Sequence, residues 1–143
     1  MHCTRSPGCY CRAIRYEVNV DSPDDLRTSL CHCKNCKKFT GGPYGVTTKL
    51  PLQSFKITVG EPASHSADNG SGSLLHRLFC KTCGGPIAEW GDAAKDTQRY
   101  IFTGTFDDIE QEGLRPKGEF FTSRRAGWLV PVEGCFQKKE IKD

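Results

Sequence analysis

Seven of the nine cysteines fall into three short motifs, and this grouping constrains the chain more than any other feature. The motifs are Cys9-Tyr10-Cys11, Cys31-His32-Cys33-Lys34-Asn35-Cys36 and Cys80-Lys81-Thr82-Cys83. The first residues carry no apolar run of the kind found in signal peptides, and no stretch of the sequence is apolar enough to span a membrane. We therefore expect a cytoplasmic protein, in which clustered cysteines indicate metal ligands rather than disulfides.

The third motif is typical of a zinc knuckle. Cys80 and Cys83 form a C-x-x-C pair, and the glycine after it permits a tight turn. Thioredoxin-like redox proteins share this pair, but a helix starts within their motif, and the run Gly84-Gly85-Pro86 disfavours a helix. A tetrahedral zinc needs two more ligands. Cys9 and Cys11 would complete a closed four-thiolate site, which stabilises a fold and performs no chemistry.

The middle motif brings three cysteines within six residues, close enough to share one ion. Three protein ligands and a vacant position are typical of a catalytic zinc. The spacing equally allows a closed site, whose fourth ligand would be Cys3, Cys135, His32 or another side chain. It also allows a different division of the ligands, in which Cys31 and Cys33 complete the knuckle and Cys9, Cys11 and Cys36 remain.

A zinc held by three thiolates has a net charge of about −1, which weakens its Lewis acidity and suits it to capturing an incoming thiol. The ionised thiol could then add to an aldehyde carbon, and the reverse step would cleave a carbon–sulfur bond. Three lysines surround the motif and either balance this charge, hold substrate carboxylates or form a solvated face; they are Lys34, Lys37 and Lys38. We expect His32 to be an exposed bystander, because neighbours in a C-x-C turn usually point away from the ligands.

The fold is predicted to be mainly β. Frequent Gly and Pro interrupt short alternating runs, such as Ile14–Val18 and Phe55–Val59. Further expected strands are Tyr44–Leu50, Leu74–Phe79, Ile87–Trp90, Tyr100–Thr103, Glu119–Thr122 and Trp128–Val130. Short helices are expected within Asp21–Leu30 and Lys34–Phe39, and an exposed loop over Ala63–Ser73. We expect Trp90 and Trp128 to pack in the core or at a sheet edge.

Composition limits the class of protein. With 143 residues, 36% hydrophobic and 26% charged, we expect one globular domain over residues 1–143. A net charge of +3 from scattered Lys and Arg gives no basic face, so we expect no nucleic-acid partner and no membrane partner.

Several runs together resemble the glutathione-dependent formaldehyde-activating enzyme family, which includes centromere protein V-like proteins. They are Gly8–Tyr16, Cys31–Lys38, Phe79–Gly84, Gly41–Gly45, Gly104–Asp108 and Arg124–Trp128. The resemblance implies short antiparallel β-sheets in a Rab-exchange-factor-like, zinc-anchored fold. It implies two Zn2+ ions per chain: a structural zinc on Cys9, Cys11, Cys80 and Cys83, and a second, open and catalytic zinc on Cys31, Cys33 and Cys36.

The activity implied by this resemblance is that of a carbon–sulfur lyase, similar to S-(hydroxymethyl)glutathione synthase, acting on a thiol such as glutathione and a carbonyl compound. The alternatives are a non-catalytic binding module with two structural zincs and a thiol-redox protein free of metal. Two positions depart from the family pattern. Arg12 replaces a common Gly after the first C-x-C, so either the turn avoids a positive φ or Arg12 reaches toward a ligand. Glu119 stands where a His often precedes the apolar pair Phe120-Phe121.

Overall fold

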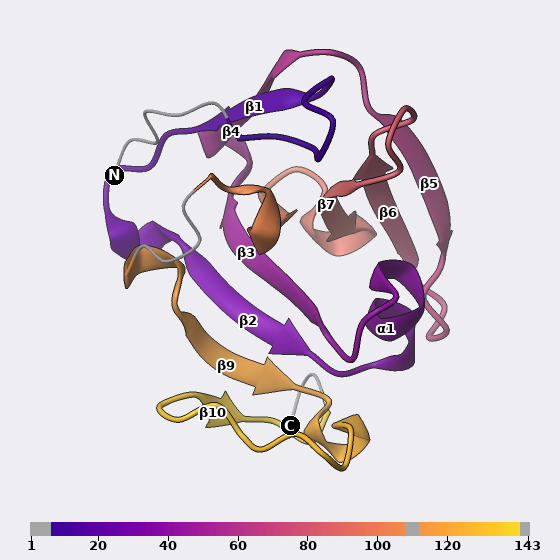
Figure 1. Cartoon of the computed structure of the whole chain (residues 1–143), viewed down its shortest axis with the longest axis vertical. Coiled ribbons are helices and arrows are strands. Elements are labelled where there is room, and N and C mark those ends of the chain that lie inside the picture. Colours follow the sequence, from indigo (N-terminus) through magenta and orange to yellow (C-terminus); the bar gives the residue numbers. More distant parts are fainter. Residues whose placement is uncertain (1–6, 108–111, 141–143) are drawn as a thin grey trace.

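The computed structural model describes residues 7–107 and 112–140, so Cys3 and Asp108 lie outside the described part. The chain forms two β-sheets, and the prediction of a mainly β fold is confirmed (Figure 1). The smaller sheet pairs β1 (Arg15–Val18) with β4 (Phe55–Val59) in antiparallel fashion. It lies across one end of the larger sheet and carries the N-terminal segment.

The larger sheet has eight strands in the order β10-β9-β2-β3-β8-β7-β6-β5. Their bounds are β2 Arg27–Cys31, β3 Gly45–Pro51, β5 Ala63–Asp68, β6 Leu74–Phe79, β7 Pro86–Gly91, β8 Gln98–Phe102, β9 Pro116–Phe120 and β10 Phe136–Gln137. Strands β2 and β9 pair in parallel, as do β9 and β10, whereas the other pairs are antiparallel. Strand β10 therefore forms one edge of the sheet, and β9 lies between it and β2, the strand that leads into the middle cysteine motif.

The core lies where the two sheets meet. Tyr16 is fully buried, packs its ring against Phe55 and Phe106, and shares a 2.6 Å hydrogen bond between its hydroxyl and that of Thr105. The other buried apolar residues include Leu26, Leu50, Ile87, Ala88 and Ile101. Burial of this set is the main stabilising term that the fold gains without metal.

Three buried threonines extend the core in a hydrogen-bonded chain. The Thr28 and Thr48 hydroxyls lie 2.7 Å apart, and the Thr48 and Thr103 hydroxyls lie 3.0 Å apart. The Thr48 hydroxyl can donate to one neighbour and accept from the other, so each of the three hydroxyls has a hydrogen-bond partner without water. The chain joins β2, β3 and the turn after β8.

The only α-helix in the described part, α1 (Lys34–Thr40), follows directly on β2. Cys33 caps its N-terminus, and Gly41 ends it in the left-handed conformation that glycine tolerates. Single 3₁₀ turns span Pro23–Asp25, Leu52–Ser54, Asp92–Ala94, Thr103–Thr105, Glu112–Leu114 and Thr122–Arg124. Helix α1 matches the helix predicted within Lys34–Phe39.

Three predicted elements differ from the structure. Asp21–Leu30 contains only one 3₁₀ turn before β2, because Leu26, Thr28 and Leu30 alternate into the core as strand residues do. The expected loop over Ala63–Ser73 begins with β5, an edge strand that is exposed on both faces and so lacks apolar alternation. Trp128–Val130 forms no strand, and both terminal residues of this segment are exposed.

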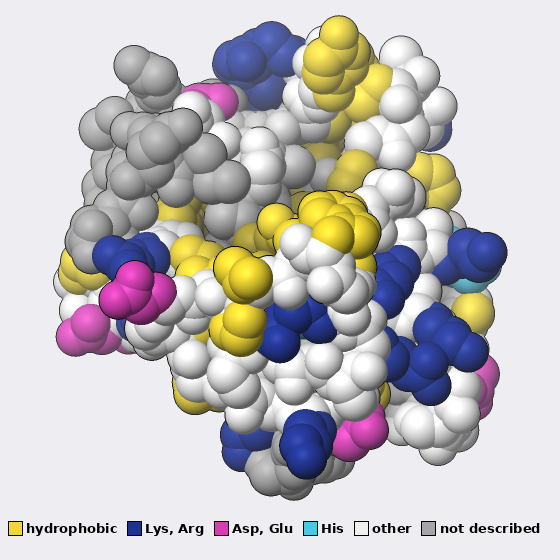
Figure 2. Space-filling model, turned by 60° about the horizontal axis from the view of Figure 1, so that its bottom comes forward, with side chains coloured by type: hydrophobic (Ala, Val, Ile, Leu, Met, Phe, Trp, Pro, Cys, Tyr) yellow, Lys and Arg dark blue, Asp and Glu magenta, His cyan; other side chains and the backbone are white. Residues whose placement is uncertain are grey.

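Figure 2 shows Lys and Arg side chains in several groups on one face of the molecule, with Asp and Glu side chains among them. Among the described residues, the single α-helix is far too short to cross a bilayer.

The approach of the N-terminal segment to β1 depends on Gly8. A Cβ at this position would lie 2.0 Å from the Ile14 carbonyl oxygen, a backbone atom that cannot rotate away. We expect Gly8→Ala to lower the free energy of unfolding by about 2 kcal/mol or more, as overpacking does. Gly127→Ala is the matched control, because a Cβ there meets nothing within 4 Å. Chemical denaturation of the two variants measures the difference, and equal midpoints would contradict the prediction.

Candidate metal centres and the adjoining pocket

The structure brings together the sulfur atoms of Cys9, Cys11, Cys80 and Cys83. All four lie within 4.8 Å of one another, although the first pair precedes β1 and the second pair lies in the turn between β6 and β7. The Sγ atoms of Cys9 and Cys11 are 3.7 Å apart, and so are those of Cys11 and Cys80. The alternative division, with Cys31 and Cys33 on the knuckle, is not the one that the structure forms.

These distances fit a tetrahedral ion. Four sulfurs at about 2.3 Å from a central zinc would be about 3.8 Å from one another. Backbone amides also point at the sulfurs: Ile14 N lies 3.3 Å from Cys9 Sγ, and Thr82 N lies 3.4 Å from Cys80 Sγ. Such N–H groups stabilise thiolates and orient them as ligands. This four-thiol group could therefore hold a metal ion.

Arg12 occupies a backbone conformation that suits glycine. Its φ is 69°, and among the described non-glycine residues only Phe121 shares a positive value. The alternative that the turn avoids a positive φ is therefore wrong. Two backbone hydrogen bonds beside the four-thiol group define the turn: the Arg12 amide donates to the Cys9 carbonyl at 3.1 Å, and the Cys9 amide donates to the Ile14 carbonyl at 3.1 Å. A glycine would form this turn with less strain.

Backbone amides in the Cys80–Cys83 turn favour the ionised form of Cys80. The Cys83 amide, and then the Thr82 amide, lower the pKa of Cys80 to about 6, although burial acts in the opposite direction. Cys80 is almost fully buried, and a buried thiolate needs a positive partner. A cation held among the four sulfurs would supply that charge.

The second group consists of Cys31, Cys33 and Cys36, whose sulfurs also lie within 4.8 Å of one another. Each comes from a different local structure: Cys31 ends β2, Cys33 caps α1 and Cys36 lies in the first turn of α1. The Cys36 amide donates to Cys33 Sγ at 3.3 Å, as expected for a capping side chain. All three side chains are half-buried.

Contacts among the three thiols shift their pKa values in opposite directions. Hydrogen bonds from Cys31 and then Cys36 lower the pKa of Cys33 to about 2. The same contact with Cys33 raises the pKa of Cys31 to about 12. One thiolate is thus stabilised by two protonated neighbours, and an ion would have to displace their protons to use all three as ligands.

No fourth His, Cys, Asp or Glu among residues 7–107 and 112–140 joins this group. Cys135 is directed elsewhere, because its sulfur lies 3.3 Å from the Pro116 carbonyl oxygen. His32 does not complete the set either. In the described part of the chain, the group therefore consists of three candidate ligands.

The expectation that His32 is exposed is wrong. Its side chain is 1% exposed, and its Nε2 lies 2.7 Å from Glu119 Oε1, which is also 1% exposed. The His32 ring packs 5.5 Å from that of Tyr44. The β-sheet explains the difference, because β9 runs beside β2 and places Glu119 behind the strand end that carries the ligands.

Glu119 connects the loop that carries the three-thiol group to the C-terminal segment. Its Oε2 accepts hydrogen bonds at 2.8 Å from the Val132 amide and from Gln137 Nε2, and lies 3.3 Å from Arg125. Burial raises the pKa of Glu119, but these partners and His32 outweigh it and lower the pKa to about 2. Since the carboxylate is ionised, His32 Nε2 is the donor of their shared hydrogen bond.

Glu89 is a functional candidate that the sequence did not reveal. On β7 it lies opposite Arg77 and Tyr100 in the register, and its side chain is 14% exposed. Burial raises the pKa of Glu89, and this effect is the largest. Arg77, at 4.0 Å, lowers the pKa and the charge of Cys33 raises it, so that the pKa is raised overall. A half-buried carboxyl that feels the charge of Cys33 can hold a proton near the three-thiol group.

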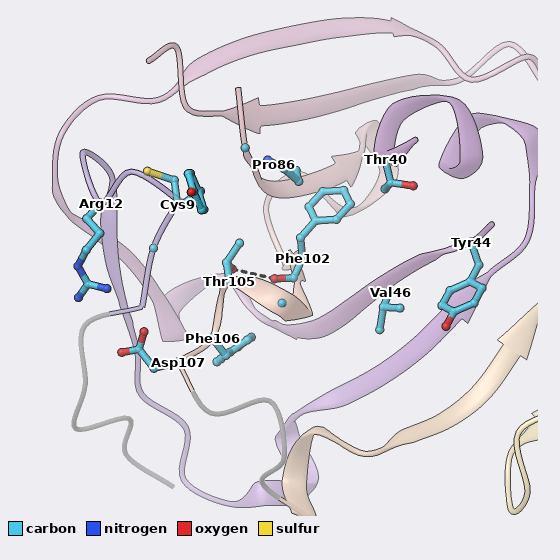
Figure 3. Close-up of a pocket in the computed structure, with 14 residues that line it drawn as sticks. Cys9, Arg12, Thr40, Tyr44, Val46, Pro86, Phe102, Thr105, Phe106 and Asp107 are labelled. Atoms are coloured by element: carbon cyan, nitrogen blue, oxygen red, sulfur yellow. Dashed lines mark hydrogen bonds between the residues drawn. The ribbon is translucent and has the colours of Figure 1, made fainter. Parts of the chain in front are cut away.

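A pocket of about 580 Å3 lies beside the four-thiol group, with Cys9 and Gly85 in its lining (Figure 3). Its lining residues are Gly8, Cys9, Tyr10, Arg12, Thr40, Tyr44, Val46, Gly85, Pro86, Phe102, Gly104, Thr105, Phe106 and Asp107. The wall at Thr40–Val46 packs on the three-thiol group, since a Cβ at Gly45 would lie 3.1 Å from Cys36 Cβ and 3.5 Å from its Sγ. The volume falls in the range of small-molecule sites.

The remaining predicted residues are divided between surface and structural roles. Lys34 and Lys38 are exposed, as the solvated-face interpretation expects, whereas Lys37 donates to the Arg124 carbonyl oxygen. Trp90 packs between His76 and Arg99, but it does so on the interior strand β7, on a face of the sheet rather than in the core or at an edge. Trp128 is 75% exposed, which contradicts the packing predicted for it, because the C-terminal segment runs over the surface there.

Comparisons with known proteins identify a family and a similar fold. The family model described as "Glutathione-dependent formaldehyde-activating enzyme" matches residues 4–124. Among solved structures, the crystal structure of a Rhodobacter sphaeroides protein, a Northeast Structural Genomics target, is similar with a TM-score of 0.54 and 17% identity. The match covers 78% of this chain and 92% of that one, and it concerns the fold alone. A search of curated proteins gave no match.

If the four-thiol group holds a structural ion, loss of that ion should destabilise the fold. We expect Cys83→Ser to unfold or aggregate at temperatures where the wild type is folded, because a bound structural metal contributes directly to folding free energy. Circular dichroism melting, combined with zinc content per chain, measures both properties. Cys135→Ser is the control, since Cys135 lies outside both groups. A normal melting temperature for Cys83→Ser would contradict the assignment.

The Glu119 contacts predict loss of stability in acid. The pKa of this group falls from 4.5 to about 2 on folding, so the stabilisation is fully present above pH ~5 and is lost as the pH falls through about 2. The contribution amounts to about 3 kcal/mol at neutral pH. We expect Glu119→Gln to flatten the pH dependence of the free energy of unfolding in this window. Glu61→Gln, at an exposed position, should leave it unchanged; identical profiles for both variants would refute the role of Glu119.

Proposed function

Because this chain belongs to the glutathione-dependent formaldehyde-activating enzyme family, we propose that it is a zinc-dependent enzyme of the carbon–sulfur lyase type. Its reaction would join a thiol to a carbonyl compound or separate their adduct, with glutathione and formaldehyde as the pair that the family name suggests. The observation that carries the proposal is the three-thiol group, for which the described part of the chain supplies no fourth ligand. A site for catalysis needs such an open position.

The two groups receive different roles in this proposal. Cys9, Cys11, Cys80 and Cys83 would hold a structural zinc, and Cys31, Cys33 and Cys36 would hold a second zinc that is open to substrate. When bound there, this second ion would supply the positive charge that lowers the pKa of an incoming thiol. All eight described cysteines are free of disulfides, which suits a role in the reducing cytoplasm.

The chemistry requires no oxidant or reductant. In the forward direction the S–H bond of the thiol breaks, a carbon–sulfur bond forms at the carbonyl carbon, and the proton passes to the carbonyl oxygen. In the reverse direction the hydroxyl proton returns to the sulfur as the carbon–sulfur bond breaks. Oxidation states balance within the two reactants, so no organic cofactor is needed.

Several residues of the chain would serve this reaction. The pocket places apolar side chains, including Val46, Phe102 and Phe106, where they can exclude water from a bound adduct. Glu89 can hold the transferred proton, because its pKa is raised and it lies within the electrostatic influence of Cys33. His32, held by Glu119, fixes the backbone between two of the ligands.

The first test is the number of zinc ions per chain, measured by native mass spectrometry before and after glutathione is added. We expect two ions at rest and a change on addition, either as bound glutathione or as loss of one ion. Two ions that ignore every thiol tested would favour a binding module with two closed sites. A metal-free chain that cycles between dithiol and disulfide would instead favour a redox protein.

Cys33→Ser separates the two metal centres. We expect this variant to fold normally and to lose at least about 100-fold in turnover, because an open-site ligand is removed while the four-thiol group stays intact. NMR exchange spectroscopy of glutathione and formaldehyde distinguishes catalysed from spontaneous exchange. Cys135→Ser should keep wild-type turnover. Full activity of Cys33→Ser with one zinc fewer would refute the mechanism.

A further inference from the structure

The β5 end of the large sheet carries a second group of reactive side chains. Ser66 on β5 lies opposite His76 on β6 in the register. Asp92 begins the 3₁₀ turn that directly follows β7, the next strand in the sheet. None of these three residues belongs to either group of cysteines, and the reaction proposed above uses none of them.

Two short hydrogen bonds join the three side chains. Ser66 Oγ lies 2.7 Å from His76 Nδ1, and Asp92 Oδ1 lies 2.5 Å from His76 Nε2. Since a carboxylate only accepts, Nε2 carries the ring proton and donates it to Asp92. Nδ1 then has a free lone pair, and the Ser66 hydroxyl donates to it. A nucleophile, a base and a carboxylate that orients the base are thus in line, with the two ring nitrogens in exchanged roles relative to serine proteases.

The imidazole of His76 is also held by packing. It stacks on the indole of Trp90, with ring centroids 5.5 Å apart and an angle of 25° between the planes. The guanidinium of Arg99 covers the same indole, with its Cζ 3.9 Å from the ring centroid. A base whose ring is fixed by two hydrogen bonds and a stacked neighbour is positioned before a reactant arrives.

The group is open to solvent. Ser66 is exposed, and the side chains of His76 and Asp92 are 22% and 51% exposed. Among the described residues, β5 is the last strand at this end of the sheet (Figure 1). Every second backbone N–H of β5 therefore faces away from β6, and the outward N–H nearest the hydroxyl belongs to Ser66 itself or to a neighbour in the strand. Such N–H groups can stabilise an oxyanion that forms at an attacked carbonyl.

We infer that Ser66, His76 and Asp92 form a hydrolytic site for small, uncharged carboxylic esters. His76 Nδ1 takes the hydroxyl proton as Ser66 Oγ bonds to the acyl carbon. The bond from that carbon to the leaving oxygen then breaks, and this oxygen takes the proton from His76. Water releases the acyl group by the same steps: it gives a proton to His76, its oxygen bonds to the acyl carbon, and Ser66 recovers the proton. One ester and one water become one acid and one alcohol.

The surroundings of Ser66 define this substrate class. Leu74, two residues before His76 on the same face of β6, is 43% exposed and offers an apolar contact for a small acyl group. Asp68, two residues after Ser66 on the same face of β5, and Asp92 would repel an anionic ester. An ester suits an open surface better than an amide, because its alkoxide leaves more readily and needs less positioning.

A fluorophosphonate probe tests the nucleophile, because an activated serine displaces its fluoride and keeps the phosphonyl group. Peptide mass spectrometry of the zinc-loaded wild type should locate the adduct on Ser66. Ser64, an exposed serine on the same face of β5, is the internal control and should stay unlabelled. An unlabelled Ser66, or equal labelling of Ser64 and Ser66, would overturn the inference.

Variants then assign the roles. His76→Gln should slow labelling of Ser66 at least about 100-fold, the usual contribution of a general base. Asp92→Asn should slow it at least about tenfold, and Asp92→Glu should restore part of the rate, which a merely structural carboxylate would not explain. Ser64→Ala should label at the wild-type rate. All four variants should keep the wild-type melting temperature, since the positions are exposed or half-buried. Undiminished labelling of His76→Gln would refute the role of His76 as the base.

The hydrolytic step needs its own measurement. After a pulse of 4-nitrophenyl acetate, peptide mass spectrometry should find acetyl on Ser66, and the acetyl should disappear during a chase without ester. Mapping the peptide separates this adduct from acetylated cysteines. Acetyl that persists on Ser66 through the chase would refute hydrolysis. Zinc content and thiol–carbonyl exchange are measured separately, so neither result depends on the proposed function.

Discussion

The contact on which the rest of the structure depends is the meeting of Cys9 and Cys11 with Cys80 and Cys83. It joins segments that are 69 residues apart, as counted between Cys11 and Cys80. This contact fixes the N-terminal segment against the β6–β7 turn and so defines one wall of the pocket. It also imposes the tight turn at Arg12. In a chain of this length, closing so long a loop costs considerable conformational entropy, and an ion held by four thiolates would offset that cost.

The three-thiol group is built on a different principle, since all its members lie within one strand–cap–helix transition. Such a local arrangement needs support from outside to keep its geometry. That support comes through the buried pair of His32 and Glu119, which ties the loop to β9 and to the C-terminal segment. The four-thiol group therefore holds distant parts of the chain together, whereas the three-thiol group is held in place by contacts with distant parts of the chain. This division matches the proposed roles of a stabilising ion and a reactive one.

The sequence predicted the cysteine motifs, the β class and helix α1, because all three depend on local spacing or periodicity. Predictions from the sequence were wrong or missing for features that depend on tertiary contacts. His32 was expected to be exposed, yet it is buried beside Glu119, which lies 87 residues away in the sequence. No local sequence pattern predicts such a contact. Strand β5 has the polar composition of a loop, since an exposed edge strand has no apolar face to reveal it. Glu89 and the pocket also escaped prediction, because each depends on strands that are brought together only by the fold.

The backbone at position 12 also has an evolutionary consequence. The turn takes a conformation natural to glycine, so the knuckle would keep its shape with either residue. Every glycine codon is one nucleotide away from an arginine codon. A lineage can therefore gain or lose a cation at the mouth of this pocket in one mutational step, without refitting the sheets or the metal ligands. The position is one where the charge lining the pocket can change while the scaffold stays the same.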